Sequence, residues 1–206
     1  MQVKLEKLTK RFNRELIFKD LNFTFESGKR YAIIGPNGSG KSTLLQIIAG
    51  YALPSSGAVI YNAGSNSIEP EEIFSHVTIA APYLEIIEEY TLVEQLEFHF
   101  KFKKIRPNYT IDSVIKAAAF EGVEHKFIKN FSSGMKQRLK LAMAFYSESD
   151  ILLLDEPTSN LDQQGVTWYQ EHLANINDRL IIIASNQEYE YITATEHLNI
   201  MHYKQS

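Results

Sequence analysis

The feature that most constrains the fold of this chain is the glycine-rich stretch Gly35-Pro36-Asn37-Gly38-Ser39-Gly40-Lys41-Ser42-Thr43. A short apolar run at 31–34 precedes it, and apolar residues with helical spacing follow it at 44–48. The expected order is therefore strand, glycine-rich loop and helix. Glycines let successive backbone N–H groups turn inward around a phosphate chain, and the helix N-terminus adds a partial charge of about +0.5. The stretch predicts a nucleotide phosphate site.

Two side chains at the start of this helix add specific chemistry. Lys41 can reach the β- and γ-phosphates, and the Ser42 hydroxyl can ligate the Mg²⁺ that accompanies them. A simple glycine-rich turn with a stray lysine would explain the glycines. It would not explain the strand before the loop, the helix after it and the hydroxyl beside the lysine. We therefore favour the phosphate site.

The composition limits the class of protein. With 206 residues, 44% of them hydrophobic, the chain can bury the core of one soluble domain with an inserted subdomain. A formal net charge of -4 argues against direct nucleic-acid binding. The absence of Cys excludes disulfides, Cys-ligated metals and a thiol nucleophile. The start carries no signal-peptide pattern and no apolar run approaches the roughly 18 residues of a membrane span, so we expect a cytoplasmic protein without membrane insertion.

The first part of the chain has the pattern of an antiparallel sheet. Apolar residues between 3 and 8 and alternating apolar residues between 21 and 25 predict two strands on either side of a turn-rich segment at 10–15. Further short strands are expected at 58–61 and 77–80, with a polar loop at 62–70 between them.

The middle of the chain changes from strand to helix after Pro82. Thr91 and Glu94 fit a capping box at the start of one helix, and a second helix is expected at 110–121. The aromatic alternation at 98–103 suggests a partner surface or an RNA patch, but we favour a helix end whose rings lie in the core. The six histidines show no ligand-like grouping and are expected at the surface.

Two all-apolar runs, at 151–154 and 180–184, predict buried parallel strands joined by a helix around 168–173. Strands alternating with helices imply an α/β fold with a largely parallel core sheet. We expect one domain, 1–206, in which 1–82 and 149–206 form the core with its N-terminal antiparallel β subdomain. Residues 83–148 would form an inserted α-helical subdomain.

Polar residues follow the strands where ligands bind in such sheets, at the carboxyl ends. Asp155 can hold the shell of Mg²⁺, and Glu156 can accept a proton from an attacking water, a role worth about 10²–10⁴-fold in rate. A solvated acidic turn is the alternative, less favoured beside a phosphate loop. Further along the chain from the loop, Ser132 opens a helix whose N-terminus is either an anion site or an ordinary Ser-capped end.

Together, these motifs resemble those of the ATP-binding cassette (ABC) ATPases over essentially the whole chain and in the right order. The resemblance implies a P-loop NTPase core. Phe12 stands at the place of the aromatic residue that stacks on adenine. The matched motifs are Walker A at Gly35 to Thr43, the signature at Ser132-Ser133-Gly134-Met135, Walker B with its catalytic Glu at Ile151 to Glu156, and the D-loop at Ser159-Asn160-Leu161-Asp162.

The resemblance implies the following site. The residues expected to bind ATP are Phe12, Gly35, Pro36, Asn37, Gly38, Ser39, Gly40, Lys41, Ser42, Thr43, Ser132, Ser133, Gly134 and Asp162. Ser42 and Asp155 would hold Mg²⁺, and the expected catalytic residues are Glu156 and Asn186.

Three positions depart from the family pattern. The signature has Ser133 for a Gly and Met135 for the Gln. Asn186 stands where the family usually has His, and an Asn is shorter and cannot become charged. The loop at 81–85 lacks the Gln expected there. We therefore expect firm ATP binding and slow turnover, and we expect Asn186→His to raise steady-state hydrolysis.

In the family, ATP lies between the Walker A motif of one subunit and the signature of the other, so the resemblance implies a two-fold dimer. The favoured function is the ATP-hydrolysing subunit of an ABC transporter, held at the inner face of the cell membrane by a separate permease that docks near 82–91. The alternative is a soluble ABC-type ATPase that switches conformation on a ribosome, DNA or an assembly partner. The tandem cassettes or long coiled coil that would mark it are absent from this sequence.

Overall fold

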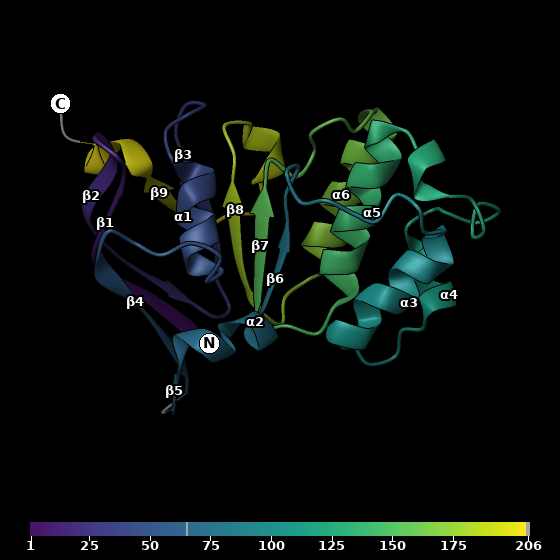
Figure 1. Ribbon diagram of the computed structural model, residues 1–206, viewed down its shortest axis with the longest axis horizontal. Helices are drawn as coiled ribbons and strands as arrows, with labels where there is room; N and C mark the ends of the chain where they lie inside the picture. Colours follow the sequence, from purple (N-terminus) through teal and green to yellow (C-terminus); the bar gives the residue numbers. More distant parts are fainter. Residues whose placement is uncertain (65, 205–206) are drawn as a thin grey trace. The chain divides into compact units, whose positions relative to one another are not determined.

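The computed structural model describes residues 1–64 and 66–204 and confirms the α/β fold class (Figure 1). The chain forms two compact units. We call them the sheet unit (1–79, 149–156 and 177 onward) and the helical unit (80–148 and 157–176). Residues 157–176 group with the helical unit, whereas the sequence pattern placed them in the core. The predicted boundaries of the inserted subdomain, 83–148, stay a prediction.

The sheet unit contains an antiparallel sheet with strand order β2-β1-β4-β5. Its strands are β1 (Gln2–Phe12), β2 (Glu15–Glu26), β4 (Ser56–Ala63) and β5 (Asn66–Ile68). The predicted turn at 10–15 is present but is shorter, at 13–14, because Phe12 already pairs with Glu15. The predicted loop at 62–70 is wrong in part, since β5 pairs with β4 and buries Ile68 against the core. Position 65 of that loop lies outside the described residues.

A second sheet in this unit has the strand order β6-β7-β8-β3-β9. Its strands are β3 (Arg30–Ile34), β6 (Val77–Ala80), β7 (Ile151–Asp155), β8 (Leu180–Ala184) and β9 (Glu196–Asn199). Strand β3 pairs in parallel with β8 and β9, and β7 pairs in parallel with β8. Every residue of β7 and β8 is buried, as the apolar runs predict.

Helix α1 (Lys41–Ile48) lies between the two sheets of this unit (Figure 1). One hydrophobic core contains its Leu44, Leu45, Ile47 and Ile48 together with apolar side chains of both sheets. The short helical elements of the unit are η1 (Pro70–Glu72), α2 (Ile73–His76), η3 (Glu188–Glu190) and η4 (Ile200–Tyr203). The start of α1, directly after the glycine-rich loop, is therefore held by the packing of the whole unit.

The helical unit contains α3 (Leu92–Phe102), α4 (Ile111–Ala117), η2 (Ile128–Asn130), α5 (Ser133–Tyr146) and α6 (Gln163–Ala174). The predicted capping box is present, since Glu94 N donates to the Thr91 hydroxyl and the Glu94 carboxylate accepts from Thr91 N. Helix α4 ends at Ala117, earlier than the predicted 121, because the chain turns back there and buries Phe120. Within residues 1–64 and 66–204, no helix is both long and apolar enough to cross a bilayer.

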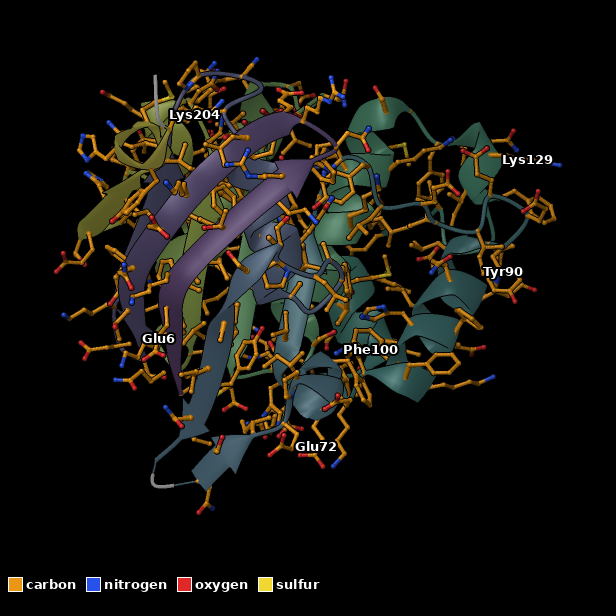
Figure 2. All side chains as sticks on the ribbon, turned by 60° about the vertical axis from the view of Figure 1, so that its left-hand side comes forward. Glu6, Glu72, Tyr90, Phe100, Lys129 and Lys204 are labelled. Carbon is orange, nitrogen blue, oxygen red and sulfur yellow. The ribbon has the colours of Figure 1, made fainter. Side chains whose placement is uncertain are left out.

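Two of the three phenylalanines at the end of α3 are exposed, contrary to the core position predicted for them, whereas Phe100 is half-buried. Phe98 and Phe102 are 36% and 75% exposed. With Tyr90 they form a row of edge-on ring contacts, with centroids 5.6 Å apart from Tyr90 to Phe98 and 5.2 Å apart from Phe98 to Phe102. Figure 2 shows Tyr90 at the outer margin of this unit. We call these three rings the aromatic row.

His99 corrects the prediction that every histidine is a surface residue. Its Nε2 lies 2.9 Å from the Ser147 hydroxyl, which itself donates to Met143 O at 2.7 Å, so His99 must be the donor. Burial, with the nearby charge of Lys103, lowers the pKa of His99 to about 4. The imidazole is therefore neutral in the folded protein.

This burial predicts a loss of stability in weak acid. The folded-state pKa lies below the unfolded value near 6.5, so the stability is complete above pH 6.5 and falls as the pH drops from 6.5 towards 4. At pH 5 the loss should be about 2 kcal/mol in the free energy of unfolding. Urea unfolding at pH 7.5 and pH 5.0 measures it. His99→Gln should reduce the difference, whereas the exposed control His125→Gln should keep it; equal differences in all three proteins would contradict this role of His99.

Candidate nucleotide site

The glycine-rich loop joins β3 to α1 in the sheet unit, as the sequence predicts. Gly40 is the N-cap of α1 with φ +101°, and a Cβ there would lie 2.3 Å from the Ile17 side chain. A Cβ on Gly35 would lie 2.7 Å from the Ser39 hydroxyl. Only glycine fits these two positions, so the backbone itself forms the inner surface of the loop.

Two polar side chains turn into this loop. The ammonium of Lys41, a residue only 4% exposed, donates to Gly35 O at 2.8 Å and to Pro36 O at 3.2 Å. An ammonium has three donors, so one N–H is left for a ligand. The hydroxyl of Ser39 is buried and has no hydrogen-bond partner among the described residues. Buried donors on a loop of glycine amides are the chemistry that an anionic phosphate requires.

The polar residues after β7 reach the same edge of the sheet as the loop. Strand β8 pairs in parallel with both β3 and β7, so the carboxyl ends of the three strands lie together. Asp155 is 1% exposed at the end of β7. Glu156 N donates to Ala184 O at 2.9 Å, and its φ of +41° is unusual for a residue with a Cβ. Such strained backbone is concentrated at functional sites.

The oxygen atoms at this edge suit Mg²⁺. Ser42, at the start of α1, supplies a hydroxyl and Asp155 supplies a carboxylate. Mg²⁺ prefers hard oxygen ligands, and proteins usually hold it through one or two carboxylates together with substrate phosphates. No group of three or more His, Asp or Glu side chains gathers within residues 1–64 and 66–204. A metal shared with phosphates fits this donor set better than an all-protein cage.

Asn186 follows β8 and contacts the glycine-rich loop directly. Its side-chain Nδ2 donates to Asn37 Oδ1 at 2.9 Å. Both residues were predicted from the sequence as site residues, but their contact was not. No local sequence signal could reveal it, because the two residues are 149 positions apart and meet only through the pairing of β3 with β8.

Phe12 lies at the end of β1, and its ring is 49% exposed. The ammonium of Lys10 lies 4.7 Å from the ring centroid and donates to Leu53 O at 2.7 Å. A cation is thus fixed over one face of the ring. Stacking of adenine on Phe12 stays a prediction.

The signature segment lies in the helical unit. Ser132 caps α5, and its hydroxyl accepts from Met135 N at 3.2 Å, so the Ser-capped helix end expected as one alternative is present. A Cβ on Gly134 would lie 2.8 Å from the backbone oxygen of Asn160, a residue with φ +65°. Asp162 caps α6, with its Oδ1 accepting from Gly165 N at 2.8 Å. The signature and the D-loop segment are therefore in direct contact within this unit.

A family model described as ABC transporter matches residues 18–159, well over half of the chain. The chain belongs to the ABC transporter family. The resemblance to the ABC ATPases is thereby confirmed.

Similar ABC proteins cover most of the chain. The ABC transporter ATP-binding protein YybJ of Bacillus subtilis (strain 168) is 31% identical over 188 residues, 90% of this chain and 86% of that protein. A dimeric post-hydrolysis structure of the ATP-binding cassette MJ0796, bound to ADP and Pi, has a TM-score of 0.81 at 23% identity and covers 96% of this chain and 94% of that one. A bacterial Atm1-family ABC exporter with ATP bound has a TM-score of 0.79 at 20% identity, over 97% of this chain and 37% of that chain. Both structures share the fold of this ABC chain.

In this ABC protein, the loop that lacks the expected Gln is attached to the signature helix. Lys140 on α5 donates to Pro82 O at 2.7 Å, and Lys136 forms an ion pair with Glu88. Gln137, buried on the same helix, donates to Pro157 O at 2.8 Å. Sequence reasoning did not single out these contacts. Polar residues on the inner side of an amphipathic helix were the one available signal.

The contact between Gly134 and Asn160 predicts that Gly134→Ala destabilises this ABC protein. The added methyl would meet a backbone oxygen, which cannot rotate away, so the free energy of unfolding should fall by about 1–3 kcal/mol. Urea denaturation measures the change. The neighbouring exposed Ser133→Ala is the matched control and should stay within about 0.5 kcal/mol of the wild type. An unchanged midpoint for Gly134→Ala would show that the two segments are not tightly packed.

Proposed function

We propose that this ABC protein binds ATP with Mg²⁺, hydrolyses it in a two-fold dimer and thereby drives a separate membrane permease. The observation that carries the proposal is the meeting of Lys41, Asp155 and Glu156 at one edge of the β7-β8-β3 pairing. A buried ammonium, a buried carboxylate and a second carboxylate on strained backbone at one site are hard to explain by stability alone.

Each residue has a distinct role in this proposal. The amides of the glycine-rich loop and the ammonium of Lys41 hold the phosphate chain, while Ser42 and Asp155 provide ligands for the metal. Mg²⁺, when bound, neutralises phosphate charge. Glu156 accepts the proton of the attacking water, and Asn186 donates a hydrogen bond to the γ-phosphate. Catalysis then depends on donors that are already in place before the reaction.

The second half of the site would come from another subunit. Ser132, Ser133 and Gly134 lie at the N-terminus of α5, where free amides and the helix dipole favour an anion. The dimeric structure of the cassette MJ0796, which shares this fold and is bound to ADP and Pi, supports a dimer; in our proposal this helix end faces the partner's nucleotide. ATP would close the dimer, and loss of the γ-phosphate contacts after hydrolysis would open it.

The variant Glu156→Gln tests the proposed reaction. It keeps the size of the side chain but removes the base, so it should bind ATP–Mg²⁺, lose at least about 10²-fold in hydrolysis and accumulate as a closed dimer. Calorimetry, phosphate release and light scattering measure the three effects. Lys41→Ala should abolish the heat of ATP binding and serves as the control. A Glu156→Gln protein that stays monomeric at saturating ATP–Mg²⁺ would contradict the dimer.

Turnover is proposed to be slow. Asn186 replaces the usual His with a shorter group that stays neutral, and the loop at 81–85 offers no Gln towards the metal and water. Its Pro82 carbonyl is already engaged by Lys140. The glycine-rich loop and the Lys41 ammonium still hold the phosphate chain, so firm ATP binding and slow hydrolysis are compatible.

The aromatic row supports the proposed permease partner. Exposed apolar groups that gather on one surface mark interaction sites, and Phe98 and Phe102 are accompanied there by Tyr90. The row lies beside the end of the segment 82–91, where a permease is expected to dock. In this assembly the protein would lie at the inner face of the cell membrane, attached through its partner.

Co-purification separates transport from the soluble alternative. If a neighbouring gene encodes a protein with several apolar spans, the two proteins expressed together should co-purify from membranes, and this chain alone should not sediment with them. Replacing Phe98 and Phe102 by Ser should reduce the co-purified amount at least about threefold without changing ATP affinity, because both rings are exposed. Recovery of the chain in the soluble fraction in every case would favour the soluble switch.

A further inference from the structure

The hydrogen bond between Asn37 and Asn186 joins two loops that follow neighbouring strands, one of which is the candidate phosphate loop. Asn37 belongs to the loop after β3, and Asn186 to the loop after β8. The two strands are neighbours in parallel register, with Ile33 opposite Ala184. The contact measures 2.9 Å from Nδ2 of Asn186 to Oδ1 of Asn37, within the normal range for a hydrogen bond.

The Asn37 end of this pair is rigid. Ser39 N donates to Pro36 O at 3.1 Å and closes a turn around Asn37 and Gly38. The ammonium of Lys204, which follows η4, donates to Gly38 O at 3.4 Å (Figure 2). The side chain of Ile200 on η4 lies against Gly35 and Gly40 and is fully buried. The loop is therefore supported from outside as well as by its own turn.

The Asn186 end is equally fixed. Ser185 N donates to Ile33 O at 3.2 Å, which attaches the start of the loop to β3. The Ser185 hydroxyl accepts from Gln187 N at 2.8 Å and donates to the carboxylate of Glu190. Ser185 and Glu190 are both buried. Asn186 thus stands on a short segment whose two neighbours are held by one buried hydroxyl.

We propose that Asn37 is a positioning residue for Asn186 and that the pair makes the site prefer ATP over ADP; this rests on the proposed function. The planar amide of Asn186 has two N–H donors, and Asn37 accepts one of them. Because the amide is planar, this bond fixes the direction of the second N–H. That second N–H donates to the γ-phosphate of ATP, which ADP lacks. A flexible Asn without this support would lose rotamer entropy on binding.

A purely structural pair would behave differently. It would stabilise both loops and affect ATP and ADP equally, since the glycine-rich loop contacts the phosphates that both nucleotides share. If Asn37 positions Asn186, replacing Asn37 lowers the affinity for ATP but not for ADP. Replacing Asn37 then has no further effect once Asn186 has been removed. The ratio of the two affinities and a double-mutant cycle therefore separate the two explanations.

The first experiment measures ATP and ADP dissociation constants by calorimetry with Mg²⁺ in the Glu156→Gln background, which prevents turnover. Asn37→Ala and Asn186→Ala should each weaken ATP about five- to tenfold and ADP less than about twofold, and the double variant should match either single variant. Asn177→Ala is the matched control, because Asn177 also accepts a long-range side-chain bond in this unit, from Arg30 at 2.9 Å. Arg30 is the first residue of β3 and lies at the amino end of the strand, away from the phosphate loop at its carboxyl end. The affinities for ATP and ADP should therefore be unchanged in Asn177→Ala.

Equal losses for ATP and ADP, or additive effects in the double variant, would overturn the positioning role while leaving the proposed function intact. A parent protein that binds no ATP would instead overturn the proposed function. The Glu156→Gln protein with both asparagines intact is measured first, so a failure of the proposed function is distinguished from a failure of the positioning role.

The second experiment uses Asn186→His with Glu156 intact. A histidine reaches further, so steady-state hydrolysis should rise at least about twofold and should no longer depend on Asn37. The rate should also acquire an acidic limb near pH 6.5, which two amides cannot produce. A rate that is unchanged, or that still falls with Asn37→Ala, would contradict the proposal.

Discussion

The parallel pairing of β3, β7 and β8 is the constraint on which the candidate site depends. Strands β7 and β8 are buried along their whole length, so their register is determined by apolar packing on both faces. Parallel strands end at one edge, and each of these three ends in a polar loop. The hydrophobic core thus brings together an ammonium, two carboxylates and an amide from distant parts of the chain.

The site concentrates groups that are costly to bury or strained. Lys41 and Asp155 are buried, and Glu156 has a left-handed backbone conformation. The fold offsets part of this cost locally, since the Lys41 ammonium donates to two loop carbonyls and Glu156 N donates to β8. Strain that persists because the surrounding strands hold it is typical of functional sites. The third N–H of the Lys41 ammonium remains available to an anionic ligand such as a phosphate.

The helical unit has its own internal linkage. Helix α5 is capped by Ser132, touches the D-loop segment through Gly134, and holds the loop at 81–90 through Lys136 and Lys140. One helix therefore connects the segment expected to meet a partner's nucleotide with the segment expected to meet a permease. In a transporter of the proposed kind, this helix would carry the conformational signal between them.

The sequence by itself determined the chemistry of this protein. The glycine-rich loop, the apolar strand ending in Asp155-Glu156 and the order of the motifs were sufficient for the fold class and the family, because local geometry and strand burial follow from residue type. Helix and strand ends were less predictable: the turn at 10–15 shortened and β5 appeared, since pairing with a neighbouring strand outweighed local turn preference.

Tertiary structure alone decided the contacts between distant segments. The Asn37–Asn186 bond, the support of the phosphate loop by Ile200 and Lys204, the burial of His99 and the exposure of the aromatic row all depend on which surfaces the packed elements cover. A sequence pattern specifies which side chains are apolar or polar along one element, but not which element lies opposite. Those positions are set only when the core closes and the strands take their register.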